Sequence, residues 1–231
     1  MKNYAKFALV LSLAFILIGS LCYAKSKNTE TNKRLVVPAW INDEDLHAES
    51  IEVQLPNSED TLALKAKIPA NWVLNPDFGG IVYQPENYAD YFYPPILSYG
   101  TNCAGSCAPK DIPKNIENLI KGIKDTLARP NINTGDPKLD AIRANVEILV
   151  EEQFAEDGWI LAAAVTYPEE LSSALYTPKF VVHAFRHHKG DGFFVQTTAR
   201  AQLTQKDEFL NIFLEACKQT DYSSSTSQHP Q

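Results

Sequence analysis

Nine consecutive residues decide the fold: Trp159-Ile160-Leu161-Ala162-Ala163-Ala164-Val165-Thr166-Tyr167. Apolar side chains occupy both the odd and the even positions, which predicts a central strand covered on both faces, although a buried helical segment has the same pattern. Pro168 follows at once and favours a strand that ends there. We therefore expect the rest of the chain to complete and cover a sheet built around this run.

Three further runs flank this central strand. Val146 to Val150 alternates apolar and acidic residues, which is typical of a half-buried strand. Phe180 to His187 and Phe193 to Leu203 are separated by the glycine-rich segment 188–192, which is typical of a hairpin turn. The four runs together predict an antiparallel meander.

The remaining elements are read from the same periodicities. Upstream, 51–55 and 62–68 predict a hairpin, and two shorter runs, 80–83 and 96–99, predict further strands. Apolar residues at steps of three and four predict amphipathic helices at about 111–128 and 205–219, the second capped by Thr204. The sequence thus predicts one α+β domain, a mainly antiparallel sheet packed with two amphipathic helices.

The N-terminus has the pattern of a secretory signal. Lys2 and Lys6 precede fifteen uncharged residues and then Cys22-Tyr23-Ala24, which predicts a signal peptide over 1–24 that is cleaved. An uncleaved anchor and a lipid attached to Cys22 are the alternatives. We expect a flexible tether at 25–34, a single domain at 35–220 and a disordered tail at 221–231, and no stable membrane span once the signal is removed.

Charge restricts the class of partner. The formal net charge of −7 becomes −9 when the two lysines of the signal are removed. Nucleic-acid binders carry basic patches, so this balance argues against nucleic acid and favours a soluble protein or one that meets a basic partner. The signal peptide and the charge together predict a periplasmic or secreted protein.

Cys103 and Cys107 enclose Ala-Gly-Ser and form the first candidate site. In a secreted chain they predict a local disulfide, because cysteines in an oxidising compartment usually pair and the small intervening residues allow a tight turn. A redox role is the alternative, but the pattern has one residue more than Cys-x-x-Cys and lacks its strand-to-helix context. Cys217 is left over and is expected to be a buried free thiol.

His183, His187 and His188, with Asp191 nearby, form the second candidate site. On a strand His183 and His187 share a face and His188 takes the other, so at most two can converge without a bulge. Histidines at the boundary of a strand with water are the ordinary alternative to a metal or acid-base site. No nucleophile, zinc or phosphate-loop motif is present, so no catalytic residue, metal or cofactor is predicted.

A tyrosine-rich segment is the best candidate for a binding surface. Tyrosine offers a large, stiff contact area with a polar tip and is enriched at interfaces. The alternative is that these rings fold back onto the sheet. The candidate surface consists of Tyr88, Tyr91, Phe92, Tyr93 and Tyr99.

One stretch resembles a known group of proteins. Leu62 to Trp72, a strand that ends in Ile-Pro-x-x-Trp, followed by hairpin strands, a helix, a meander and a final helix, resembles the Mog1/PsbP-like group. The resemblance implies an α/β/α sandwich and a binding or assembly role without a shared catalytic site. The cysteine loop and the tyrosine segment depart from the pattern of the group.

Two functions from different classes follow. The first is a non-enzymatic binding or accessory protein that acts on a protein partner in the cell envelope, for which an immunity protein against a toxin is one form. The second is a metal-dependent or other hydrolase that uses His183, His187 and His188.

Overall fold

The computed structural model describes residues 45–56, 59–103, 112–129, 137–171, 176–188, 193–222 and 226–227. All of them belong to one compact unit, Ala39–Gln231. The predicted signal peptide, the tether and the start of the domain at 35–44 lie outside the described residues. Within the described part of the chain, no helix combines the length and the apolar character needed to cross a bilayer.

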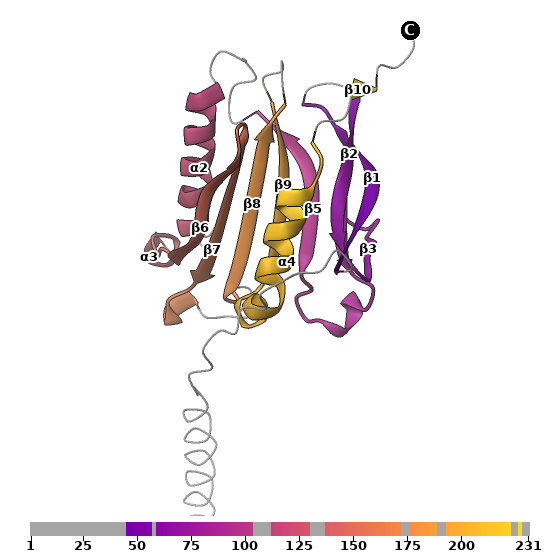
Figure 1. Cartoon of the computed structure of the whole chain (residues 1–231). Coiled ribbons are helices and arrows are strands. Elements are labelled where there is room, and N and C mark those ends of the chain that lie inside the picture. The colour runs from indigo at the N-terminus through magenta and orange to yellow at the C-terminus, as the bar shows by residue number, and fades with distance from the viewer. Residues whose placement is uncertain are drawn as a thin grey trace, which may run out of the picture. The chain divides into compact units, whose positions relative to one another are not determined.

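A seven-stranded antiparallel sheet forms the centre of the fold (Figure 1). Its strand order is β3-β4-β5-β9-β8-β7-β6, so the last four strands form the predicted meander. The bounds are β3 (Trp72–Leu74), β4 (Ile81–Pro85), β5 (Ile96–Asn102), β6 (Asn145–Ala155), β7 (Gly158–Thr166), β8 (Lys179–His187) and β9 (Phe194–Gln202).

The central run behaves as the sequence predicts. On β7 the even residues Ile160 and Ala162 are fully buried on one face, and the odd residues Leu161 and Ala163 are fully buried on the other. Covering both faces removes water from every side chain of the run, which is why a continuous apolar pattern is stable there. The alternative of a buried helix is excluded.

A second, smaller sheet was not predicted as a separate element. It joins β1 (Leu46–Gln54), β2 (Thr61–Pro69) and the short β10 (Thr226–Ser227). The β1–β2 pair is the predicted hairpin, in which Ile51 pairs with Leu64 and Val53 with Leu62. All four of these side chains are buried.

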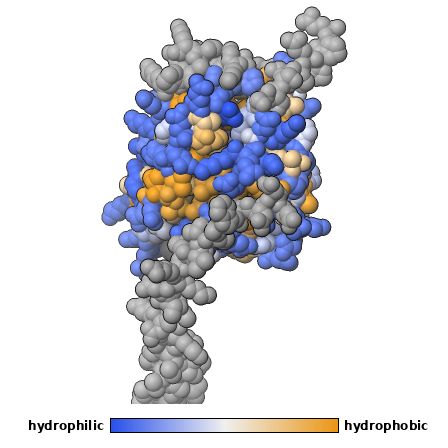
Figure 2. Space-filling model, in the orientation of Figure 1, coloured by the Kyte–Doolittle hydropathy of each residue, from blue (hydrophilic) through white to orange (hydrophobic). Residues whose placement is uncertain are grey.

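Two amphipathic helices cover opposite faces of the large sheet. Helix α2 (Ile112–Ala128) places Leu119 against Phe185 and Phe194 on one face. Helix α4 (Lys206–Gln219) lies in front of β8 and β9 in Figure 1 and contacts β2 as well, so it fills the space between the two sheets. The surface on this side is mostly hydrophilic, apart from an apolar area beside α4 (Figure 2).

Aromatic rings fix α4 in place. The ring of Trp72 meets Phe209 and Phe213 edge-on, with centroids 5.9 Å and 5.7 Å away, and Phe180 packs on Phe213 from β8. Short helical segments complete the fold: α3 (Pro137–Asp140), η2 (Tyr88–Asp90), η4 (Glu169–Leu171) and η5 (Leu203–Gln205). The α+β class predicted from the sequence is therefore confirmed.

The C-terminal prediction needs a correction. Tyr222 lies in the expected disordered tail, yet it is only 4% exposed and its hydroxyl contacts Thr197 Oγ1 at 2.8 Å. Asp221 bridges to Lys65, and Thr226–Ser227 pairs with β2. The serine-rich composition of this segment did not indicate that the Tyr222 ring is buried or that backbone groups of the segment pair with β2.

The start of α4 also differs from the prediction. Thr204 does not cap the helix; Gln202 and Gln205 form a capping box at η5 instead. The chain passes from β9 directly into η5, so the N-cap is Gln202, two residues before the predicted Thr204.

Candidate functional site

The exposed apolar side chains gather at one edge of the large sheet. Six large hydrophobic residues are exposed among the described residues, and the sixth, Ile148, lies on β6 at the opposite edge. We call the other five the aromatic edge: Val73, Leu74, Phe78, Tyr88 and Phe92.

Local backbone structure explains why these side chains point outward. Asn71 has a φ of 62°, a left-handed conformation that asparagine tolerates, and it turns the chain between β2 and β3. The turn places Trp72 in the core, so alternation along β3 exposes Val73. The carbonyl of Asn71 accepts a hydrogen bond from the backbone N–H of Glu86 at 2.8 Å, which ties this turn to the segment that carries Tyr88.

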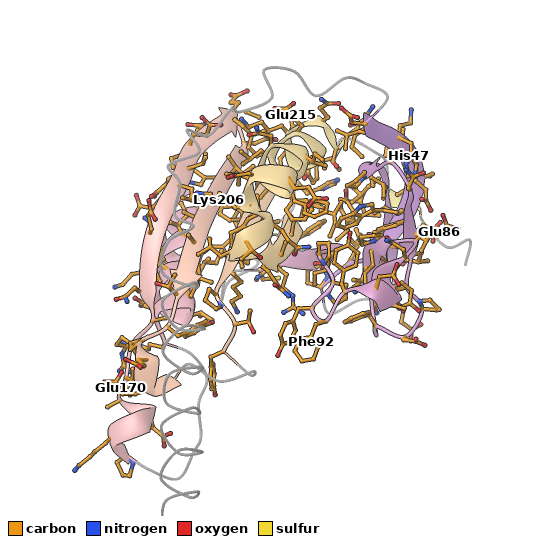
Figure 3. The ribbon with its side chains drawn as sticks, turned by 90° about the horizontal axis from the view of Figure 1, so that it is seen from below. His47, Glu86, Phe92, Glu170, Lys206 and Glu215 are labelled. Carbon is orange, nitrogen blue, oxygen red and sulfur yellow. The ribbon has the colours of Figure 1, made fainter. Side chains whose placement is uncertain are left out.

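The predicted tyrosine surface is only partly at the surface. Phe92 is 79% exposed and points away from the ribbon in Figure 3, and Tyr88 is exposed as well. Tyr91 and Tyr93 are half-buried, and the Tyr93 ring lies against Phe92 with centroids 4.7 Å apart. Including Tyr99 was wrong, because it is buried and its hydroxyl donates to the carbonyl of Lys67 at 2.8 Å.

The aromatic edge is acidic. Asp77, Glu86 and Asp90 lie between its residues in the sequence and are exposed. The sequence from Pro69 to Pro109 contains no lysine, arginine or histidine. The chain segment that presents the exposed rings therefore contributes no cation of its own, so repulsion of a basic partner could come only from other elements.

The three histidines do not converge. His183 and His187 share the α2 face of β8, as predicted, whereas His188 stacks on Phe193 with ring centroids 5.1 Å apart. Within the described ranges, no three histidine, cysteine or acidic side chains are close enough to hold a metal, and Asp191 lies outside them. His187 is 8% exposed, and its Nε2 has no hydrogen-bond partner among the described residues.

His183 is part of a polar row under α2. Its Nδ1 lies 3.4 Å from Gln196 Nε2 and 3.3 Å from Thr198 Oγ1, so the ring nitrogen accepts from the glutamine amide. Asn102 in turn donates to Gln196 Oε1 at 3.1 Å. Burial lowers the pKa of His183 from 6.5 to about 4, and the charge of Lys179 acts in the same direction. A neutral histidine that accepts a hydrogen bond is therefore a structural group here.

Of the cysteines singled out in the sequence, Cys217 lies in the core, and Cys103 borders a segment outside the described residues. Cys217 is a buried free thiol, as predicted, and burial raises its pKa above the usual value, which makes it a poor nucleophile. Cys103 directly follows β5 and packs half-buried against the core. Cys107 lies outside the described residues, so the Cys103–Cys107 disulfide stays a prediction.

A groove beside α2 is a further concavity that the sequence did not indicate. It has a volume of about 650 Å³ and runs between α2 and the β6–β7 turn. Ile116, Ile120 and Trp159 form its apolar floor, and a salt bridge from Lys124 to Glu151 at 2.7 Å closes one side. Since charges of both signs line it, the groove favours no one class of ligand.

Comparison with known proteins finds distant structural similarity. No family model and no curated protein matches the sequence. The chain is similar to LpqN, involved in cell envelope biogenesis of Mycobacterium tuberculosis, with 15% identity over 76% of this chain and 91% of that chain and a TM-score of 0.47. It is also similar to the Ran-binding protein Mog1p of Saccharomyces cerevisiae, with 10% identity over 77% and 97% of the two chains and a TM-score of 0.42.

A Mog1 mutant gives a third match, with 11% identity over the same shares of the two chains and a TM-score of 0.41. Mog1 is thus among the proteins that the chain resembles, as its Pro-x-x-Trp stretch and order of elements predicted. Such identities and TM-scores transfer no activity and no partner, so function has to be argued from the residues of this chain.

Proposed function

We propose that this chain is a non-enzymatic binding protein of the cell envelope that contacts a protein partner through the aromatic edge. The observation that carries the proposal is the gathering of Val73, Leu74, Phe78, Tyr88 and Phe92, all exposed, at one edge of a sheet whose other apolar side chains are mostly covered. Burying such rings against a partner releases water and contributes about 25 cal/mol for each Å² of apolar surface.

Charge selects the kind of partner. The acidic residues around the aromatic edge favour a basic surface that carries an apolar side chain to cover Phe92. The signal peptide predicted over 1–24 supports an encounter in the periplasm or outside the cell. An immunity protein is one form of this function, and a toxin with a basic surface would be its partner.

The test compares two edges of the same sheet. Phe92→Ser and Glu86→Lys change the apolar and the acidic component of the aromatic edge. Ile148→Ser and Glu147→Lys make the same changes on β6, where Ile148 is 40% exposed and Glu147 is exposed as well. Each protein, without its signal, is used to capture proteins from the native envelope fraction, followed by quantitative mass spectrometry.

The expected result is a protein captured by the wild type and by both β6 variants, and lost by at least tenfold with Phe92→Ser and Glu86→Lys. The interaction is then repeated with the two purified proteins, where added salt should weaken it because exposed charges contribute. A partner that survives both changes at the aromatic edge, or one that the β6 changes remove equally, would contradict the proposal.

A further inference from the structure

A small cavity opens next to the aromatic edge, where β8 begins and β9 ends. Its volume is about 270 Å³, and Phe78 and Tyr93 form part of its wall. Two cations, Lys179 and Arg200, also line it. This combination is unexpected in a chain with a net charge of −7, and none of these residues belongs to the histidine or cysteine sites predicted from the sequence.

Strand register brings the two cations together. Lys179 of β8 pairs with Gln202, and Arg200 pairs with Val181 two residues farther along. Directly paired residues share a face of the sheet, and so do residues two apart on one strand, so both cations project from the same face at diagonal positions. They are therefore close enough to act on one ligand.

The positive charge of this pair is not balanced inside the described protein. Neither Lys179 nor Arg200 forms a salt bridge among the described residues, although other cations do, such as Arg186 with Asp157 at 2.7 Å. Burial lowers the pKa of Lys179, and the charge of Arg200 lowers it further. Lys179 is half-buried and Arg200 is exposed, so water screens part of their repulsion, and an anion between them would reduce it further.

A third group in the cavity is also a donor. Gln84 is only 1% exposed, and it follows Tyr83, which pairs with Leu97, so it lies on the same face as Ile96 and the paired Arg200. Its Oε1 already accepts a hydrogen bond from Asn75 Nδ2 at 2.6 Å. The Nε2 amide of Gln84 makes no hydrogen bond within the described part of the chain, so it can donate to a ligand in the cavity. Ammonium, guanidinium and amide groups all donate, so the ligand has to accept.

Apart from Thr177 and Gln202, the rest of the wall is apolar or aromatic. Tyr93 and Tyr167 both line the cavity, and the ring of Tyr167 packs against Tyr176 with centroids 5.5 Å apart. Pockets for small molecules combine such walls with a few polar groups that fix the orientation of the ligand. The volume of about 270 Å³ lies just below the usual range of about 300 to 1,000 Å³, which limits the ligand to one ring or a short chain.

We propose that this cavity binds a small organic acid, with its carboxylate or phosphate between Lys179 and Arg200 and its apolar part between Tyr93 and Tyr167. Arginine recognises both groups through its paired N–H donors, and lysine adds a point charge. The ligand can be a free molecule or an acidic group of the partner that docks on the aromatic edge, since Phe78 and Tyr93 connect the two sites.

The test uses the purified chain and simple probes. Benzoate and phenyl phosphate supply a ring with either anion, and benzamide supplies the same ring without charge. Binding is measured by calorimetry and by ligand-observed NMR for the wild type, Lys179→Gln and Arg200→Gln. Lys121→Gln and Arg129→Gln are matched controls, because both remove an exposed cation of α2 or its end. Melting temperatures show that each variant is folded.

We expect at least one of the two anions to bind tenfold more tightly than benzamide, and each cavity variant to weaken that binding at least tenfold. The two controls should bind as the wild type does, and the better of the two anions identifies the acidic group. Equal binding of all three probes, or anion binding that persists in both Lys179→Gln and Arg200→Gln, overturns the proposal.

A second arm identifies the source of the anion. Once the partner is known, Arg200→Gln either weakens its capture, which assigns the acid to the partner, or leaves capture unchanged while benzoate or phenyl phosphate binding is lost, which assigns it to a free molecule. The small-molecule test does not require a partner, so its failure and the failure of the proposed function can be distinguished.

Discussion

Acidification should destabilise this fold through His183, a half-buried histidine beneath α2. The pKa of His183 is lowered from 6.5 to about 4, chiefly by burial. A lowered pKa means that the folded protein resists a proton that the unfolded chain accepts. The contribution of His183 to the unfolding free energy is therefore fully present above pH 6.5 and decreases as the pH falls towards 4. Below pH 4 the histidine is protonated in both the folded and the unfolded state, so the loss levels off.

The magnitude follows from the size of the shift. At about 1.4 kcal/mol for each pKa unit, a decrease from 6.5 to about 4 corresponds to ~3 kcal/mol, and residual contact with solvent reduces this to about 2 kcal/mol. Among the described residues that line the cavity at His183, none carries a charge that would offset the cost. The cavity between α2 and β8 is lined by Asn102, Asn118, Thr126 and apolar residues, with no carboxylate among them.

His183→Asn is the matched change, because the asparagine oxygen replaces the accepting Nδ1 but never gains a proton in this range. Urea unfolding of the wild type and the variant at intervals from pH 7 to pH 4 gives the difference in unfolding free energy at each pH. We expect His183→Asn to be less stable at pH 7, because the ring is lost from a packed interface, and to recover about 2 kcal/mol relative to wild type by pH 4. His47→Asn, which alters an exposed histidine of β1, should leave the pH dependence unchanged.

A difference between wild type and His183→Asn that stays constant from pH 7 to pH 4 would refute this reasoning. It would mean that the imidazolium finds a partner or water in the folded state. A loss of stability with falling pH that is equally steep in both proteins would show that carboxylates common to them, and not His183, control acid unfolding.

Two further predictions concern the C-terminus and the cysteine loop. Tyr222→Phe should lower the unfolding free energy by about 1 to 3 kcal/mol, because the fully buried Thr197 hydroxyl loses its partner, whereas Tyr88→Phe at the exposed edge should change it little; urea unfolding of both variants measures this. Free-thiol counting on the oxidised, unfolded chain without its signal should find one thiol, from Cys217, and three thiols would show that Cys103 and Cys107 are not bridged. Changing both loop cysteines to serine should lower the melting temperature modestly, because a ring this short contributes at the low end of about 2 to 4 kcal/mol.

The elements that the sequence predicts best are those whose burial follows a local period. The apolar residues at odd and even positions of β7 show that both faces of the strand are covered, and the spacing of Leu119 and Ile123 shows which face of α2 is covered. Each pattern lies within one segment, so the sequence alone reveals it. Tyr99 shows how the same signal can be overlooked. It shares the parity of Leu97 on β5 and is buried with it, whereas Tyr88 and Phe92 lie in the loop between strands.

What the sequence does not reveal depends on contacts between distant segments. Val73 and Leu74 are exposed because β3 is the last strand of its sheet, and strand order is not visible in a run of three residues. Lys179 and Arg200 are 21 positions apart in the sequence and become neighbours only through the β8–β9 register. Tyr222 is buried because the chain turns back after α4 onto β2 and β9, which its serine-rich surroundings do not predict.

The two edges of the large sheet differ in a way that bears on how a partner binds. β6 is an eleven-residue edge strand that could pair with another chain, but it carries Glu147, Glu151 and Glu152 and has two irregularities in register, features that discourage such pairing. β3 has only three residues, so it offers few backbone groups for an added strand, and its exposed side chains are apolar. The β6 edge is thus protected from strand pairing by its acidic side chains, whereas the β3 edge presents exposed apolar side chains. A partner at the aromatic edge should therefore bind by covering side chains such as Phe92, and a proline placed in the partner's contacting segment should weaken binding less than removal of its apolar side chain.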